Sequence, residues 1–351
     1  MMNRTIGMKS DIGKTREVDE DSIRAETSEC IIKSKMRKVR LLIVADGLGG
    51  HQKGEEASKI ATESIFREWS KELSNGTPFN LILEQGIQNA NQNILDYTSK
   101  HPEASGMGTT AVHAIVQDND DVTLANVGDS RAYVISANEI RQETKDDSFV
   151  QELVDKGEIT KDEARDHPDK NVITKAVGIS SSLEADIKTV HLENDESLLL
   201  CCDGVIAHLS DDDIKKIVQE TPDPQHACKK IVDMANDRGG SDNISLIILS
   251  KPLDLKELDS KKLSEQEDTI TKLQVSLAEN EHKIKDLEIA LQQSRQEENK
   301  DLTKGKVMPE LFDEIDAKKM QTQKKLKEKK QKWETKLAGL KQSLKEQENE
   351  K

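Results

Sequence analysis

A change of composition at residues 251 and 252 most constrains how this chain can fold. Before it, short apolar runs alternate with turn residues; after it, Lys, Glu, Gln and Leu dominate and glycine almost disappears. Apolar, β-branched runs are typical of buried strands, whereas a sequence rich in Lys, Glu and Leu is typical of long helices. We therefore expect two parts, a globular domain over residues 1–252 and a helical tail over residues 253–351.

Net charge separates the same two parts. Residues 1–250 hold 29 Lys and Arg against 45 Asp and Glu, whereas residues 251–351 hold 23 against 22. An acidic domain repels a nucleic-acid backbone but suits a cation site, so we expect no nucleic-acid partner. The sequence contains neither an N-terminal apolar segment nor a run of 18 apolar residues. We therefore expect a cytoplasmic protein without a secretion signal or a membrane span.

Hydrophobic patterning predicts an α+β domain. Apolar, β-branched runs predict six strands, at residues 41–45, 110–116, 122–127, 132–135, 197–202 and 243–249. Several runs are continuous enough to be buried on both faces. Amphipathic helices are predicted around residues 57–69 and 83–94, with further helices starting at Ser210 and lying around residues 231–235. Because the strands come in neighbouring groups separated by tight turns, antiparallel sheets covered by helices are favoured.

The tail shows a seven-residue repeat. An apolar residue recurs every seven positions from Leu263 to Leu291, while the offset position is polar in three of five repeats. This predicts a weakly paired coiled coil, broken near residues 305–309. A helical hairpin within one chain and pairing between chains both stay open. Residues 317–341 hold ten Lys and two Glu, which fits either a solvated helix face or a docking surface for an acidic partner or a membrane.

The four cysteines, Cys30, Cys201, Cys202 and Cys228, lack the spacing of metal-binding motifs. Two of them are adjacent within the apolar run at residues 197–202. We therefore expect buried thiols that pack as small apolar residues.

Four aspartates stand where predicted strands give way to turns: Asp21, Asp46, Asp203 and Asp242. An unpartnered carboxylate at the rim of a core is costly, so several together predict bound cations. Oxygen ligands without a His or Cys cluster favour Mg²⁺ or Mn²⁺ over zinc. Taken singly, an Asp-Gly pair is equally well explained by a turn, and only the set is specific.

Motifs in a fixed order extend this reading over residues 5–250. They are Ser10 to Gly13 with Arg16 and Asp21-Ser22, Asp46 to His51, Gly106 to Thr110, Asn126 to Arg131, Cys202 to Gly204, and Ser241 to Asn243. With these motifs the chain resembles the metal-dependent serine/threonine protein phosphatases of the 2C type, and their bacterial branch more than the animal one. Each motif alone is weak, but the complete order argues against chance.

The resemblance implies a sandwich of two antiparallel β-sheets flanked by helices, with a two-metal centre at one end. It implies that Arg16 binds the substrate phosphate and that Glu20 acts through a metal-bound water. The implied metal ligands are Asp46 as the bridge, the Gly47 carbonyl and Asp21 for one ion, Asp203 and Asp242 for the other, and Asp129 for a third, more weakly held ion.

Two positions depart from the family pattern. Leu48 stands where animal members have a histidine proposed to protonate the leaving group; bacterial members lack it too, so no general acid is assigned and the nearby His51 is expected to be structural. Asp147 stands where the family usually has a histidine before Ser148, which leaves the role of that position open. Residues 149–177 resemble the variable flap in which substrate choice is expected.

The implied function is hydrolysis of phosphoserine and phosphothreonine on phosphorylated proteins, by a water that two Mn²⁺ or Mg²⁺ ions activate. A role in signalling follows, with the tail as a targeting or oligomerisation module. The main alternative is an inactive scaffold with the phosphatase fold that acts through its coiled coil. A third reading has the tail deliver a promiscuous catalytic domain to one partner. Because the site residues are all present, the active enzyme is favoured.

Overall fold

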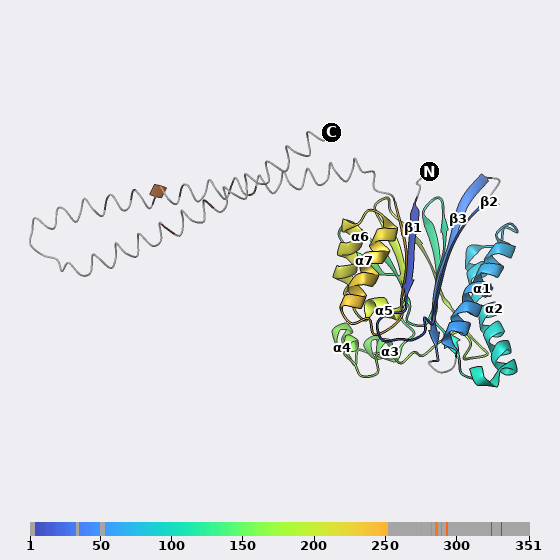
Figure 1. Ribbon diagram of the computed structural model, residues 1–351. Coiled ribbons are helices and arrows are strands. Elements are labelled where there is room, and N and C mark those ends of the chain that lie inside the picture. The colour runs from blue at the N-terminus through green and yellow to red at the C-terminus, as the bar shows by residue number, and fades with distance from the viewer. Residues whose placement is uncertain are drawn as a thin grey trace, which may run out of the picture. The chain divides into compact units, whose positions relative to one another are not determined.

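The computed structural model describes residues 4–32, 35–49 and 53–251, together with nine single residues further on (Figure 1). The chain divides into two compact units, Met1–Pro252 and Leu253–Lys351. The nine described residues of the second unit, among them Lys272 and Gln331, are helical. The predicted heptad positions and the break near residues 305–309 lie outside the described residues. In the part of the chain that is described, no helix has the length and apolar character needed to cross a membrane.

Two antiparallel sheets form the centre of the first unit. One sheet has the order β1-β11-β10-β7-β8, and the other has the order β2-β3-β5-β6-β9, with β4 paired to the end of β3. The first sheet consists of β1 (Thr5–Asp11), β7 (Arg131–Ile135), β8 (Ile140–Gln142), β10 (Ser197–Cys201) and β11 (Ile244–Ser250). The second consists of β2 (Asp21–Ile32), β3 (Lys35–Leu48), β4 (Gly108–Thr109), β5 (Ala111–Gln117), β6 (Asp121–Val127) and β9 (Asp186–His191).

Helices cover the outer face of each sheet, which gives four layers in the order helix, sheet, sheet, helix (Figure 1). The second sheet is covered by α1 (Gly54–Glu72) and α2 (Phe79–Lys100), which the short η2 (Pro102–Ala104) follows. The first is covered by α5 (Asp203–Ile206), α6 (Asp211–Glu220) and α7 (Pro224–Asp237). Two short helices, α3 (Phe149–Asp155) and α4 (Lys161–Arg165), lie in the connection between β8 and β9.

Local sequence explains where the predicted helices begin. The Ser210 side chain accepts a hydrogen bond from the backbone N–H of Asp213, whose own side chain caps the Ser210 backbone in return. This reciprocal capping satisfies two N–H groups that would otherwise lack partners, so α6 starts here. At the start of α7, the Asp223 side chain accepts a hydrogen bond from the His226 N–H, and Pro224 occupies the first helical position, where no N–H is needed.

The strand β3 shows why the apolar runs are continuous. Leu41 and Ile43 pack against α1 and α2, whereas Leu42 and Val44 pack between the two sheets. Successive side chains of a strand point to opposite faces, so a strand covered on both sides needs apolar residues throughout. Each such side chain contributes about 1.5–3 kcal/mol relative to an exposed one.

The six predicted strands are confirmed, and so is the antiparallel sandwich. The apolar runs did not predict β1, β2, β4, β8 or β9. The reason is visible in β9, an edge strand in which most residues are exposed and none is fully buried. Likewise β2 carries polar residues along its length because it forms the edge of its sheet.

A buried ion pair closes the end of the sandwich at which β1 and β6 begin. Arg4, directly before β1, places its Nε 2.6 Å from Oδ1 of Asp120, directly before β6. Arg4 also donates to the backbone carbonyls of Glu193 and Glu196, and both Arg4 and Asp120 are buried. At this end, the buried charges therefore find all their partners within the protein.

Candidate metal centre

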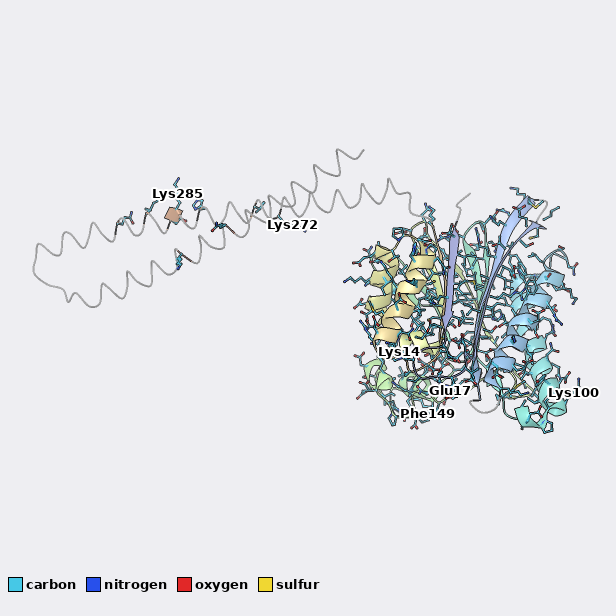
Figure 2. All side chains as sticks on the ribbon, viewed as in Figure 1. Lys14, Glu17, Lys100, Phe149, Lys272 and Lys285 are labelled. Atoms are coloured by element: carbon cyan, nitrogen blue, oxygen red, sulfur yellow. The ribbon has the colours of Figure 1, made fainter. Side chains whose placement is uncertain are left out.

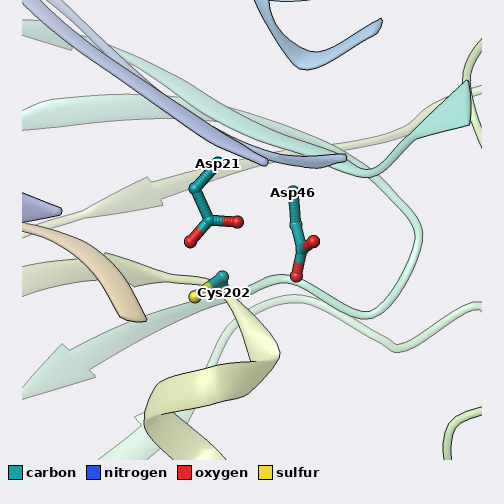
Figure 3. Close-up of side chains that lie close together, drawn as sticks. All are labelled: Asp21, Asp46 and Cys202. Carbon is teal, nitrogen blue, oxygen red and sulfur yellow. The ribbon is translucent and has the colours of Figure 1, made fainter. Parts of the chain in front are cut away.

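The pairing of β2 with β3 brings two acids together at the opposite end. In this ladder Asp21 lies directly across from Asp46, and residues so placed have Cβ atoms about 4.5–5.5 Å apart. Cys202, directly after β10, supplies a third side chain. One ligand atom from each of Asp21, Asp46 and Cys202 lies within 4.8 Å of the others, and Figure 3 shows the three side chains converging.

Three further predicted acids belong to the same cluster. Asp203, the first residue of α5, interacts electrostatically with Asp46 and contributes to the raised pKa of the Asp46 carboxyl. Asp129, which follows β6, is buried and repels Asp46 electrostatically. Asp242 precedes β11 and repels Asp203. The structure therefore brings together all five aspartates that the sequence singled out.

Burial and mutual repulsion make this cluster hard to ionise without a cation. Burial is the largest cause of every shift: it raises the pKa of Asp21 to about 7 and that of Asp129 to about 8, and neighbouring acids add to both shifts. The pKa of Asp46 rises well above its usual range for the same reasons, burial first and then Asp21, Asp203 and Asp129. Removing charged groups from water favours their neutral forms, and like charges add to this effect.

Several carboxylate oxygens of the cluster have no hydrogen-bond partner among the described residues. They are both oxygens of Asp21 and one oxygen each of Asp129 and Asp203, all of them buried. The Ser245 hydroxyl and the Cys202 thiol approach Asp21 and moderate its pKa, but neither completes a hydrogen bond to it. Hard oxygen donors left open in this way fit Mg²⁺ or Mn²⁺.

Cys202 was expected to be an apolar packing residue. All four cysteines are indeed free and buried, but Cys202 has polar neighbours. Its sulfur accepts a hydrogen bond of 3.1 Å from the Ser245 N–H and lies 3.5 Å from the Asn243 carbonyl oxygen. Burial, followed by the charges of Asp21 and Asp46, raises the pKa of this thiol well above its usual value. Its position directly before Asp203 is the sequence signal that could have placed it at the site.

Arg16 lies on the loop between β1 and β2, beside the acids. Its Nη2 donates to Oδ2 of Asp242 at 2.9 Å, and its Nη1 lies 3.6 Å from Oε2 of Glu20. The Arg16 side chain is 42% exposed, whereas Glu20 is buried, which raises the Glu20 pKa. An exposed guanidinium at the rim of a carboxylate cluster can receive an anion from solvent.

Asn243 organises this loop, a role that the sequence did not predict. Its buried amide donates to the carbonyls of Ile12 and Val18, each at 3.0 Å, and accepts from the Glu20 N–H at 2.9 Å. One side chain therefore fixes both ends of the segment that carries Arg16. Lys14 and Glu17 of this loop lie at the same end of the domain as Phe149 of α3 (Figure 2).

Gly47 is confined by its surroundings. A Cβ atom here would lie 2.2 Å from the carbonyl oxygen of Gly54, so only glycine fits. Its N–H donates to the Glu20 carbonyl at 3.1 Å, which ties the end of β3 to the start of β2. The carbonyl of Gly47 as a metal ligand stays a prediction, and His51 lies outside the described residues.

The chain is similar to known protein phosphatases in both sequence and fold. The family model "Protein phosphatase 2C" matches residues 28–236. The serine/threonine phosphatase stp of Listeria monocytogenes is 34% identical over 222 residues, which cover 63% of this chain and 88% of the relative. The crystal structure of Stp1 from Staphylococcus aureus matches with 32% identity and a TM-score of 0.63, over 71% of this chain and 95% of that one.

A structure of the catalytic domain of the phosphatase PstP in complex with two manganese ions also matches, with 29% identity and a TM-score of 0.59, over 70% of this chain and 97% of that one. The structural matches thus cover about 70% of this chain and nearly the whole of each related chain. The chain therefore belongs to the protein phosphatase 2C family, and it is an enzyme of the metal-dependent serine/threonine protein phosphatase class.

Proposed function

We propose that this enzyme hydrolyses phosphoserine and phosphothreonine in proteins with two Mn²⁺ or Mg²⁺ ions. The observation that carries the proposal is a cluster of buried carboxylates with open oxygens next to an exposed arginine. The ions would be held by Asp46 as the bridge, the Gly47 carbonyl and Asp21 on one side, and Asp203 and Asp242 on the other, with Asp129 for a third. The two manganese ions in the related PstP structure support a site for two metal ions.

The chain's own residues would prepare the reaction. When bound, the ions acidify a water and stabilise the charge of the phosphate during in-line displacement. Arg16 would bind two phosphate oxygens through its planar fork of donors, and its contacts with Asp242 and Glu20 hold the fork near the cluster beforehand. Glu20 would accept a hydrogen bond from water at the edge of the site.

Removal and return of the metal tests the proposal. Phosphate release from a phosphothreonine peptide should stop with chelator and return with Mn²⁺ or Mg²⁺. If neither Mn²⁺ nor Mg²⁺ restored turnover in a folded protein, the proposal would be overturned and the inactive scaffold would be favoured.

Substitution of Arg16 by Lys separates substrate binding from metal binding. A point charge cannot replace a bidentate contact, so KM for the peptide should rise more than metal affinity falls. If metal affinity collapses while KM is unchanged, Arg16 supports the metal site instead.

We further propose that residues 1–252 form the phosphatase domain and that residues 253–351 form a separable helical tail that sets where the enzyme acts. The composition change at residue 252 supports this division, since it follows the last strand, β11. Residues 1–252 alone should keep kcat on a small substrate. A dimer that becomes a monomer on truncation would favour pairing between chains, and lost turnover would contradict a separable tail.

The location that we propose for the enzyme is cytoplasmic. Its four free cysteines are in keeping with this location.

A further inference from the structure

Asp147 stands at a junction between two loops. It lies in the segment that joins β8 to α3, and its Oδ2 accepts a hydrogen bond of 3.1 Å from the Gly128 N–H. Its own N–H donates to the Gly128 carbonyl at 2.9 Å, and its carbonyl accepts from the Thr174 N–H at 2.8 Å. Gly128 directly precedes Asp129, and Thr174 lies in the flap, residues 149–177. One residue therefore contacts both the loop of a cluster carboxylate and the flap.

The second carboxylate oxygen of Asp147 binds the flap as well. The Nζ of Lys175 lies 3.0 Å from Oδ1 of Asp147; the Asp147 side chain is 11% exposed and that of Lys175 is 42% exposed. The two oxygens thus accept from two donors, the Gly128 N–H and the Lys175 ammonium. A neutral imidazole has only one acceptor nitrogen, so a histidine at this position could not accept from both.

The neighbours of Asp147 hold it in place. Asp146 forms a bidentate ion pair with Arg131, with Nη2 to Oδ2 at 2.7 Å and Nε to Oδ1 at 3.0 Å. On the other side, the Ser148 side chain caps α3 by accepting from the Gln151 N–H. Asp147 is therefore the fixed partner of the pair, and Lys175 is the partner that the flap contributes.

We propose that Asp147 is a positioning residue that couples the flap to the Asp129 loop through its ion pair with Lys175. The pair holds the C-terminal part of the flap against the site, so that substrate access and the position of Asp129 depend on each other. The consequence for catalysis rests on the proposed function, but the coupling itself does not.

Limited trypsin digestion of the full-length protein measures the coupling without any activity. Cleavage after Lys156, Lys161 and Arg165 reports local opening of the flap, because a protease cuts the transiently opened state. Asp147→Asn and Lys175→Met should each speed this cleavage roughly two- to five-fold, the effect of a partly exposed ion pair.

The double variant and the controls decide the interpretation. Because both substitutions break the same pair, the double variant should be cut no faster than either single variant. Lys175→Arg keeps the charge and should restore the wild-type rate. Glu152→Gln removes an acid of α3 whose ion-pair partner, Lys156, directly follows the same helix, and should leave the cleavage rate unchanged. Additive effects, or wild-type cleavage in both single variants, would overturn the proposal.

Kinetics then connect the coupling to function. KM for a phosphothreonine peptide should rise by the same factor in Asp147→Asn and Lys175→Met, because both variants break the same ion pair. An unchanged KM in variants with faster cleavage would exclude a role in substrate access. If the wild type released no phosphate at all, the proposed function would fail, whereas the digestion result would still decide the coupling.

Discussion

The two ends of the sandwich treat buried charge in opposite ways. Where β1 and β6 begin, the carboxylate of Asp120 is paired with Arg4 at 2.6 Å. Where β6 ends, an oxygen of Asp129 is buried without a partner among the residues that the structure describes, and Asp21 has two such oxygens. The same strand therefore carries a satisfied acid at one end and an unsatisfied acid at the other.

The difference shows what each end is for. A buried pair with complete hydrogen bonds needs nothing from solution, so its role is structural. Several unpaired carboxylates cost free energy in the folded protein unless a cation binds to them. The site end thus needs cations from solution to complete its contacts, whereas the opposite end does not.

The largest effect is expected for Asp46→Asn. The charges of Asp21, Asp203 and Asp129 all repel that of Asp46, which is the proposed bridge between the two ions. Its loss should lower kcat by several orders of magnitude, whereas the metal-free protein should be as stable as wild type or more stable, because repulsion is relieved. Near-normal turnover measured at saturating Mn²⁺ would contradict the two-metal assignment.

The second largest effect is expected in the pH dependence of stability, which the metal-free cluster should dominate. Burial raises the pKa of Asp21 to about 7 and of Asp129 to about 8, against about 4 in an unfolded chain. The folded protein therefore binds more protons than the unfolded one between these values. The stability this contributes is fully present below about pH 4 and is lost as the pH rises through 7 and 8.

Thermal unfolding with chelator from pH 5 to pH 8 measures this loss, which should be on the order of a few kcal/mol. Mn²⁺ should reverse it, since the ion binds the ionised form. Asp129→Asn removes one titrating group and should show a shallower slope. Equal slopes for this variant and wild type would mean that Asp129 does not belong to the titrating cluster.

At the other end, Asp120→Asn should reduce stability and leave catalysis intact. Asp120 has a positive φ of 67°, a conformation that asparagine tolerates well. The substitution leaves the buried Arg4 without its counter-charge, which should cost about 3 kcal/mol. Urea unfolding measures the loss, and kcat per folded molecule should stay at the wild-type value. A large fall in kcat here would mean that the two ends are coupled.

The smallest effect is expected for Asn243→Ala, which should lower stability, as a change at the structural end does, and also raise KM, as a change at the site does. Asn243 lies at the site but is fully hydrogen-bonded, so its removal leaves buried groups such as the Glu20 N–H unpaired and should cost about 1–3 kcal/mol. Because the loop carrying Arg16 loses its clamp, KM for a phosphopeptide should also rise. A loss of stability with unchanged KM would show that the loop holds Arg16 without Asn243.

Sequence patterns predicted most of the buried framework and the members of the cluster. Strands such as β3 and β11 are covered on both faces, so their apolar runs stand out. Edge strands such as β2 and β9 have one open side, and their mixed composition resembles that of loops. For these strands, the decisive information is the partner strand, which lies far away in the sequence.

The residues of the site also divide into those that local sequence predicts and those that depend on distant contacts. The aspartates were recognisable because each lies in a short motif, although their roles as ligands stay predictions. Asn243 and Cys202 belong to the same motifs, but their importance depends on contacts with Val18 and Asp21, more than 180 residues away in the sequence. The sequence marks Asp147 as a departure from the family's histidine. Its proposed positioning role depends on its contacts with Gly128 and Lys175.

The unbroken ladder from Asp21 opposite Asp46 to Ile32 opposite Lys35 has a consequence for how this enzyme can evolve. Inserting one residue inside β3 would turn Asp46 to the other face of the sheet and separate it from Asp21. Additions at the hairpin tip, where Ile31 and Met36 are exposed, would leave Asp21 directly opposite Asp46. Natural variation in length, and inserted tags or peptides, should therefore be tolerated at the tip and rejected in the strands below it.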